Sequence, residues 1–270
     1  MRSPVRLVAT DLDGTLLDGS GRIDERSVAA VAAARQAGIH VVPVTGRPPQ
    51  SLWPFCDVAR LGPLGVCSNG AAVVDIDARR VLEVQALAGE IATGLVALVR
   101  QAVPDVLLAV DNLGRFTYEQ GFLTISGPWA DEVTEQGDVA GAVADGCLKL
   151  IARRPGWSAL ELIEMLEARI GEEGSVTTSG LDWVDIAAPG ISKAYALERV
   201  CDRLGVSVDE VVAIGDNHND LPVLAWAGTA MVPDNAVAEA RALADRVLPD
   251  HGEGAVATLL EELVGGRAPG

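Results

Sequence analysis

The sequence has few of the residues that build disulfide frameworks and zinc sites. Its 270 residues include 3 histidines and 4 cysteines. The cysteines lie far apart, with neither a C-x-x-C pair nor an adjacent histidine to complete a zinc site: they are Cys56, Cys67, Cys147 and Cys201. We therefore expect four buried free thiols. The apolar run at residues 5–9 is cut short before it could serve as a signal peptide, and together with free thiols it predicts a cytoplasmic protein.

The sequence also has few basic residues and lacks a long apolar run. Lysine and arginine total 21 against 38 acidic residues, which gives a formal net charge of -17. An anionic surface repels nucleic acid and acidic membranes, so we expect neither as a partner. No uncharged apolar stretch approaches the roughly 18 to 20 residues that a membrane-spanning helix requires. An anionic substrate would need a local basic site.

Both ends of the sequence alternate between strand-like and helix-like segments. Residues 5–10, V-R-L-V-A-T, are a short β-branched run that predicts a buried strand. Residues 24–37 suit a helix, with Asp24 as N-cap and Gly38 placed to end it. Similar pieces recur as strand-like runs at 39–44, 64–68 and 211–214 and as a helix-like segment at 192–204. This alternation predicts a parallel α/β sheet.

The middle of the sequence has a different rhythm. Helix-like segments are interspersed with paired strand-like runs, at 88–102 and 158–170 for the helices and at L-L-A-V (107–110) and R-F-T-Y (115–118) for the strands. This mixture favours a separate α+β domain. We predict that it spans 84–186 and is inserted between two parts of an α/β core, residues 1–83 and 187–270.

The segment D-L-D-G-T at 11–15 places two carboxylates directly after the first predicted strand. Asp11 and Asp13 are two residues apart, so in an extended segment both side chains can face the same side. Phosphoryl transfer needs an in-line nucleophile, a proton for the leaving oxygen and positive charge around the phosphoryl oxygens. A carboxylate is a suitable nucleophile, because water readily hydrolyses the acyl-phosphate that it forms. Asp11 and Asp13 are candidates for these first two tasks.

Three further segments could complete such a site. T-G-R at 45–47 follows a strand, and its hydroxyl and N–H groups could hold phosphate oxygens. Lys193 begins a predicted helix, where its ammonium and the helix N-terminus could neutralise a phosphate. G-D-N-H-N-D at 215–220 places Asp216 and Asp220 after a strand, with the oxygen ligands that magnesium prefers. Each segment alone is more typical of a turn, a cap or a solvated side chain, whereas the four together favour catalysis.

These segments resemble a known family. D-L-D-G-T, T-G-R, G-I-S-K at 190–193 and G-D-N-H-N-D occur in the order of the four motifs of haloacid dehalogenase-type phosphatases. With S-N-G-A at 68–71, the chain more narrowly resembles the Cof-type subfamily (IIB). In that subfamily this segment precedes a large cap inserted between the second and third motifs. The resemblance covers nearly the whole chain. It implies a doubly wound, Rossmann-like parallel-sheet core, an α+β cap of the C2B type that chooses the substrate, and Mg²⁺ as cofactor.

The resemblance also implies a role for each matching residue. Asp11 would be the nucleophile and a metal ligand, and Asp13 would be the general acid and base and would offer its main-chain carbonyl to the metal. Asp216 would complete the direct metal ligands. The phosphoryl group would be held by Thr45, Gly46, Lys193 and Asn219, with supporting roles for Asp220, which would orient Lys193 or a metal-bound water, and for Arg47 and Asn69.

The implied activity is the magnesium-dependent hydrolysis of a small phosphorylated metabolite, a sugar phosphate or a similar ester, by a monomer or homodimer. Two alternatives stay open. A sugar phosphomutase uses the same aspartyl-phosphate but returns it to another hydroxyl, and a non-catalytic metabolite-binding protein could have the same fold.

Some residues are expected to have other roles. We expect a structural role for His40 and a solvated side chain for His218, while His251 suits either the cleft or a loop. M-V-P-D-N-A at 231–236 departs from the compact M-G-N-A turn of relatives and is expected beside the active site. Tryptophans of the insert are expected in its core, with Trp183 also a candidate to face the cleft: they are Trp129, Trp157 and Trp183.

Overall fold

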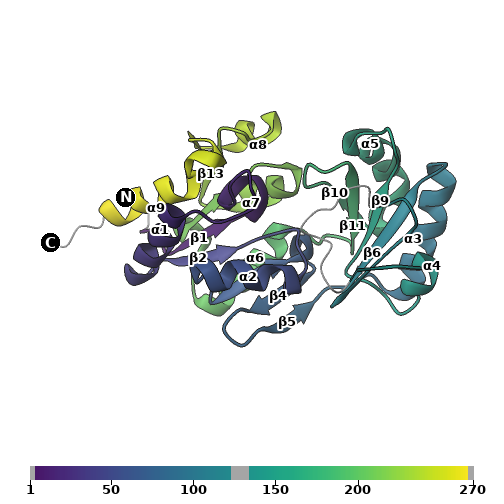
Figure 1. The fold of residues 1–270 in the computed structure, drawn as a ribbon, viewed down its shortest axis with the longest axis horizontal. Coiled ribbons are helices and arrows are strands. Elements are labelled where there is room, and N and C mark those ends of the chain that lie inside the picture. Colours follow the sequence, from purple (N-terminus) through teal and green to yellow (C-terminus); the bar gives the residue numbers. More distant parts are fainter. Residues whose placement is uncertain (1–3, 123–133, 267–270) are drawn as a thin grey trace.

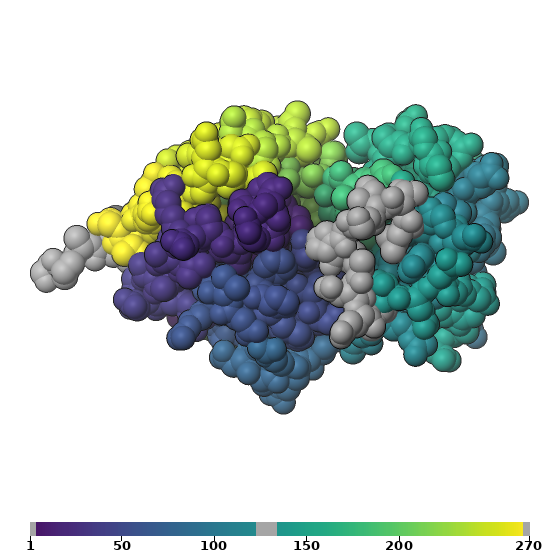
Figure 2. All heavy atoms as spheres, viewed as in Figure 1, coloured from purple at the N-terminus to yellow at the C-terminus, as the bar shows by residue number. Residues whose placement is uncertain are grey.

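The computed structural model describes residues 4–122 and 134–266. Figure 1 shows two lobes, a larger one that contains both ends of the chain and a smaller one, in teal, built from the middle of the sequence. The space-filling view shows the same division (Figure 2). Trp129 lies outside the described residues.

The larger lobe is built on a parallel sheet. Within the described residues its strands have the order β14-β13-β12-β1-β2, and each neighbouring pair is parallel. These strands are β1 (Leu7–Thr10), β2 (His40–Pro43), β12 (Val211–Ile214), β13 (Thr229–Pro233) and β14 (Arg246–Leu248). The predicted parallel α/β sheet is confirmed.

Helices cover both faces of this sheet, which makes it doubly wound. Val8 of β1 packs into an apolar cluster with one group of helices, and its neighbours Leu7 and Ala9 pack into a second cluster on the opposite face. The helices of the first cluster are α1 (Glu25–Gln36), α2 (Pro49–Ala59) and α9 (Ala255–Gly265), and those of the second are α6 (Lys193–Leu204), α7 (Leu221–Trp226) and α8 (Ala238–Leu243). Burial on both faces explains the uninterrupted apolar runs of these strands.

The helix ends follow the capping residues of the sequence. Asp24 accepts a hydrogen bond from the backbone N–H of Ser27 and begins α1. Ser192 does the same for the N–H of Tyr195 at the start of α6, which ends at Gly205 with φ of 62°. The capping residues therefore fix where Lys193 enters α6.

The strand predicted at residues 64–68 pairs differently from the expectation. β3 (Leu64–Cys67) forms an antiparallel three-stranded sheet with β4 (Ala72–Asp75) and β5 (Arg80–Val84). One edge of β3 meets the parallel sheet through the parallel bridge between Val44 and Val66, where the N–H of Thr45 donates to the carbonyl of Val66. The tight turn at Ser68–Gly70 returns the chain as a hairpin along the other edge of β3. The expected strand therefore lies beside the parallel sheet, and its antiparallel hairpin was not predicted.

The smaller lobe has a mixed sheet covered by helices on one face. Its strand order in the described residues is β10-β11-β9-β6-β7-β8, antiparallel except between β7 and β8. The strands are β6 (Leu107–Asn112), β7 (Arg115–Tyr118), β8 (Thr134–Gln136), β9 (Lys149–Arg153), β10 (Ser175–Thr177) and β11 (Trp183–Ala187), and the helices are α3 (Gly89–Ala102), α4 (Val139–Ala142) and α5 (Ala159–Ile170). The predicted α+β organisation and the helix at each expected position are confirmed.

The two faces of this mixed sheet differ in composition. Leu108, Val110 and Leu150 point into the apolar cluster beneath the helices. The opposite face carries Ala109 and Ile151, which pack with Phe122 and a group of partly buried aromatic residues. Charged side chains on this second face contact the larger lobe, so the face is turned towards it.

The described tryptophans of the insert pack as expected. Trp157 packs against the cluster beneath the helices, and the ring of Trp183 lies 5.8 Å from that of Phe122.

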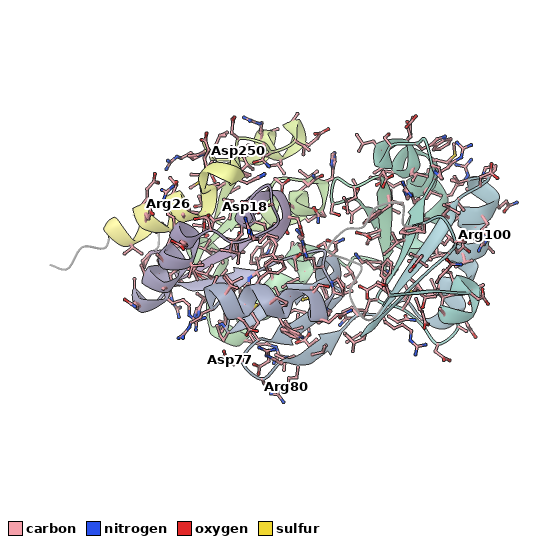
Figure 3. All side chains as sticks on the ribbon, viewed as in Figure 1. Asp18, Arg26, Asp77, Arg80, Arg100 and Asp250 are labelled. Atoms are coloured by element: carbon pink, nitrogen blue, oxygen red, sulfur yellow. The ribbon has the colours of Figure 1, made fainter. Side chains whose placement is uncertain are left out.

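The cysteines are buried and the surface is charged, as the composition predicts. Cys56, Cys67, Cys147 and Cys201 are free and buried, as predicted. No helix of the described residues is long and apolar enough to span a membrane. Figure 3 shows charged side chains on the outside of both lobes, with Asp77 and Arg80 at the tip of the β4–β5 hairpin and Arg100 on α3.

Candidate active site

The predicted motif residues lie at one edge of the parallel sheet. Asp11 follows β1, and its backbone N–H donates to the carbonyl of Ile214, the last residue of β12. Thr45 follows β2, and Asp216 follows β12. Because carboxyl ends of parallel strands share an edge, segments about 200 residues apart in sequence meet here.

Lys193 is enclosed between two carboxylates. Its Nζ lies 2.9 Å from Oδ1 of Asp11 and 2.7 Å from Oδ1 of Asp220, and its side chain is 0% exposed. Burial opposes the charged form, but the two carboxylates outweigh it and raise the pKa of Lys193 above its ordinary value. Lys193 therefore stays an ammonium at neutral pH.

Asp220 has both carboxylate oxygens occupied. While Oδ1 accepts from Lys193, Oδ2 accepts from the backbone N–H groups of Asp216 and Asn217, each at 3.1 Å. This geometry agrees with the expectation that Asp220 orients Lys193.

The acidic residues form a compact cluster. Oxygen atoms of Asp11, Asp216 and Asp220 lie within 4.8 Å of one another, and all three residues are buried. Burial raises the pKa of Asp11 well above its ordinary value although Lys193 opposes the shift, and burial together with Asp220 raises the pKa of Asp216 to about 7. When they are ionised, carboxylates this close together repel one another. A hard divalent cation that they bind through their oxygen atoms would relieve the repulsion. Since Asp220 is engaged elsewhere, Asp11 and Asp216 are the side chains of this cluster that fit such a cation.

Local packing holds Asp216 in place. Its Oδ1 accepts a hydrogen bond of 2.9 Å from the hydroxyl of Thr15. Gly14 has φ of +75°, and a Cβ at that position would lie 2.5 Å from Oδ2 of Asp216. The glycine of D-L-D-G-T therefore makes room for the carboxylate of G-D-N-H-N-D.

Asp13 is paired with Arg47. The guanidinium Nε donates to Oδ2 of Asp13 at 2.7 Å and a second nitrogen reaches Oδ1, a bidentate contact. The side chain of Asp13 is 47% exposed and that of Arg47 is 4% exposed, with the guanidinium 4.9 Å from the ring centre of Phe55. Arg47, expected only to support the site, thus directly contacts the expected proton-transfer group.

The expected phosphate-holding residues lie close together. The side-chain amide of Asn219 donates to Oδ1 of Asn69 at 3.0 Å. Gly46 lies against the same Asn69, since a Cβ on it would come within 2.9 Å of that Oδ1. Thr45 is fully buried, and its hydroxyl accepts the backbone N–H of Arg47 at 3.1 Å.

Three buried charged residues of the smaller lobe reach this site and were not singled out from the sequence. Lys149 donates to the carbonyl of Gly46 at 3.0 Å and lies 3.1 Å from Asp185, which accepts from Asn69 at 2.8 Å. Asp111 accepts from the hydroxyl of Ser68 at 2.8 Å. Their signal in the sequence is a single charged residue inside an apolar strand-like run, at L-L-A-V-D (107–111), C-L-K-L-I (147–151) and V-D-I-A (184–187).

His218 and the 231–236 loop lie near the motif residues. His218 Nε2 lies 3.9 Å from a carboxylate oxygen of Glu239, and His218 lines a cavity between the lobes that Lys193 and Asn219 also line. Neither His218 nor His251 lines the cavity at Asp11. Asn235 of the loop donates to the carbonyl of Gly14 at 2.8 Å, which confirms that this departure from the usual turn lies beside the site.

A cavity of about 120 Å³ lies where the lobes meet. The larger lobe contributes Asp11, Asp13, Gly46, Arg47 and Asn219. The other wall comes from the inner face of the mixed sheet, so a molecule bound at Asp11 would touch both lobes.

Comparisons with known proteins agree with this geometry. A protein-family model described as haloacid dehalogenase-like hydrolase matches residues 8–260. Pyridoxal phosphate phosphatase YbhA of Escherichia coli K12 is 30% identical over 266 residues, covering 94% of this chain and 97% of its own length.

Two solved structures share the fold. SMU.1108c from Streptococcus mutans UA159 superposes with a TM-score of 0.86 at 20% identity, over 97% of this chain and 99% of that one. BT4131, described as a sugar phosphatase of subclass IIB, has a TM-score of 0.81 at 17% identity, over 96% and 98% of the two chains.

Proposed function

This chain belongs to the haloacid dehalogenase-like hydrolases as a Cof-type phosphatase, and we propose that it hydrolyses a small phosphorylated metabolite in a magnesium-dependent reaction through an aspartyl-phosphate on Asp11. The observation that carries the proposal is the enclosed Lys193 between Asp11 and Asp220, beside Asp216. The ammonium of Lys193 is fully buried, so it does not serve as a hydrated surface charge. It lies at the sheet edge where the four motifs meet. Its charge is available to a transferring phosphoryl group.

In the first step, a carboxylate oxygen of Asp11 attacks phosphorus while the bond from phosphorus to the ester oxygen breaks. Asp13 gives a proton to the departing alcohol, and Arg47 holds Asp13 at the cavity wall. Lys193 and the amide of Asn219 hold the phosphoryl oxygens, together with Thr45 and the backbone at Gly46. Lys193 also favours the ionised form of Asp11, because its positive charge opposes the effect of burial on the pKa of that carboxyl.

In the second step, water attacks phosphorus and the bond to Asp11 breaks, releasing inorganic phosphate. Asp13, now a carboxylate, takes the proton of the attacking water. A magnesium ion held by Asp11, Asp216 and the main-chain carbonyl of Asp13 would supply positive charge at the phosphoryl oxygens. Asp220 keeps Lys193 in place throughout.

The proposal also covers the division into core and cap, the localisation and the oligomeric state. Residues 84–186 act as the cap on a core of residues 1–83 and 187–270, and the cap selects the substrate and excludes bulk water. The enzyme works in the cytoplasm as a monomer or homodimer.

The test is phosphate release from a panel of phosphomonoesters with magnesium, compared with the same assay in a chelator. We expect turnover with magnesium and none from Asp11→Asn, which keeps the size of the side chain but removes the nucleophile. Asp77→Asn, at the hairpin tip, is the matched control and should retain full activity. Folding of each variant is checked by urea unfolding. A folded wild-type protein that releases no phosphate would refute the proposal, and isomer formation seen by NMR without phosphate release would indicate a mutase.

A further inference from the structure

A chain of side-chain hydrogen bonds joins the smaller lobe to the residues proposed to hold the phosphoryl group. Asp185 of β11 accepts a hydrogen bond of 2.8 Å from the side-chain amide of Asn69, and Asn69 accepts one of 3.0 Å from the amide of Asn219. All three residues are buried. The chain therefore starts in the smaller lobe and ends at an amide that the proposed mechanism places on the phosphoryl oxygens.

The carboxylate at the start of this chain fixes the direction of each hydrogen bond in it. A carboxylate only accepts, so Asn69 must turn its NH2 group towards Asp185 and its oxygen towards Asn219. Asn219 must then present its own NH2 group to that oxygen. Asn69 uses one N–H of this group, and the second N–H remains for a phosphoryl oxygen.

The surroundings of Asn219 do not explain this orientation by themselves. Its Oδ1 is buried and has no hydrogen-bond partner among the residues that the structure describes. A buried acceptor without a partner is unfavourable. The orientation of the amide is therefore imposed from the Asp185 end of the chain.

Asp185 faces a donor on each side. Nζ of Lys149 lies 3.1 Å from its Oδ1 and also donates to the carbonyl of Gly46 at 3.0 Å, while Asn69 donates to its Oδ2. Two acceptor oxygens are needed to satisfy both neighbours, and a carboxylate supplies them. An amide at this position has one oxygen and would turn its NH2 group towards one of the two donors.

Backbone contacts hold both asparagines in place. Asn69 has φ of 56°, and its N–H donates to the carbonyl of Thr45 at 3.1 Å. The N–H of Asn219 donates to the carbonyl of Thr178 in the smaller lobe, also at 3.1 Å. Because the positions of the two residues are fixed in this way, the direction of their amides is what remains for Asp185 to set.

We infer that Asp185 is a positioning residue, which acts through Asn69 to direct the amide N–H of Asn219 at the phosphoryl group. The inference rests on the proposed placement of that group at Asp11. Asp185 lies in the smaller lobe and both asparagines lie in the larger one, so the direction is set only while the lobes are in contact. Binding of the phosphoryl group is thereby coupled to that contact.

The substitution Asp185→Asn reverses the chain while keeping the size of the side chain. Hydrogen bonds to a charged donor are roughly twice as strong as neutral ones, so the single oxygen of the new amide turns to Lys149. Its NH2 group then faces Asn69, which has to rotate its own amide. Asn219 consequently presents its oxygen in place of its NH2 group, and an oxygen repels a phosphoryl oxygen.

The test is the affinity for inorganic phosphate, measured by calorimetry with magnesium present, in a double-mutant cycle of Asp185→Asn and Asn219→Ala. We expect Asp185→Asn alone to raise the dissociation constant of phosphate roughly 10-fold or more, because a hydrogen bond to a charged group is lost. In the Asn219→Ala background the same substitution should change it by less than about 2-fold, since the amide that Asp185 orients is absent.

A second variant and a control accompany the cycle. Asn69→Ala removes both hydrogen bonds at the middle of the chain and should weaken phosphate binding in the wild type but not in Asn219→Ala. Asp145→Asn, which changes an exposed carboxylate of the same lobe, should leave the affinity unchanged. Calorimetry gives the binding-competent fraction and the affinity separately, so partial unfolding of a variant does not imitate the expected effect.

The outcomes separate this inference from the proposed hydrolysis. Equal losses of affinity with and without the amide of Asn219 would overturn the inference, as would unchanged affinity in both Asp185→Asn and Asn69→Ala. Neither result affects hydrolysis, which phosphate release by the wild type tests. A wild type that releases no phosphate from any ester but shows the coupling would refute hydrolysis and support the positioning role.

Discussion

Replacing Gly70 by alanine should damage the site through the start of α6. Gly70 has φ of +104°, and a Cβ on it would lie 2.1 Å from the backbone carbonyl oxygen of Ser192 and 2.6 Å from its carbonyl carbon. Real contacts of this kind exceed 3 Å, so the backbone at Ser192 has to move by about 1 Å, and Lys193 moves with it. A displacement of this size at a catalytic group lowers the rate by roughly 100-fold.

Gly190 supplies the matched control. It has φ of +73°, but a Cβ there would meet nothing within 4 Å. Both alanine variants bear the strain of a left-handed conformation, about 1–2 kcal/mol, and only Gly70→Ala adds the overlap, about 1–3 kcal/mol more. We therefore expect Gly70→Ala to lower the free energy of unfolding by about 2–5 kcal/mol and Gly190→Ala by about 1–2 kcal/mol.

Two measurements check this difference. Urea unfolding gives the free energies, and phosphate release at saturating substrate gives kcat, which Gly190→Ala should leave within about 2-fold of the wild type. Equal losses of stability in both variants, with kcat of Gly70→Ala unchanged, would refute the reasoning. Such a result would mean that α6 tolerates the shift without displacing Lys193.

Two further predictions concern the metal and pH. Magnesium at about 100 times its dissociation constant should add about 2.7 kcal/mol to the free energy of unfolding. Asp216→Asn should remove at least half of this gain. An undiminished gain in that variant would exclude Asp216 as a ligand. Hydrogen bonds from Arg199 and Arg203 of α6 lower the pKa of Glu83, so its folded-state pKa lies below the unfolded value of about 4.3. The stability that Glu83 contributes is present above the unfolded pKa and is lost as pH falls through the folded pKa. Glu83→Gln should therefore destabilise the protein at pH 7 and much less near pH 3. Urea unfolding at both pH values checks this, and an equal effect at both would contradict it.

The sequence predicted those parts of the structure that depend on local chemistry. Asp24 and Ser192 mark helix starts through their own backbone hydrogen bonds, and the apolar runs of the parallel strands reflect burial on both faces. Residues that follow such strands meet at one edge, so the grouping of Asp11, Lys193 and Asp216 follows from topology.

The remaining features depend on contacts that strand and helix patterns do not encode. The antiparallel hairpin of β3 with β4, on the edge of β3 away from the parallel bridge at Val44, depends on which strands lie side by side in the folded chain. The contact of Arg47 with Asp13 depends on how two loops approach each other. Lys149 and Asp111 reach the site only because the inner face of the mixed sheet is turned towards the larger lobe, and that orientation is a property of the assembled chain.

The contacts between the lobes have a consequence for the temperature dependence of the lobe separation that the proposed cap requires. Three of them are hydrogen bonds of buried polar groups, and the apolar cluster that spans the junction is small, consisting of Ala71, Leu148, Ala187 and Ile191 with two partly buried neighbours. The large apolar clusters belong to one lobe each. Separating the lobes therefore hydrates polar and apolar surface together, and because these change the heat capacity in opposite directions, the net change is small. The ratio of open to closed molecules should vary smoothly with temperature over the range in which each lobe stays folded.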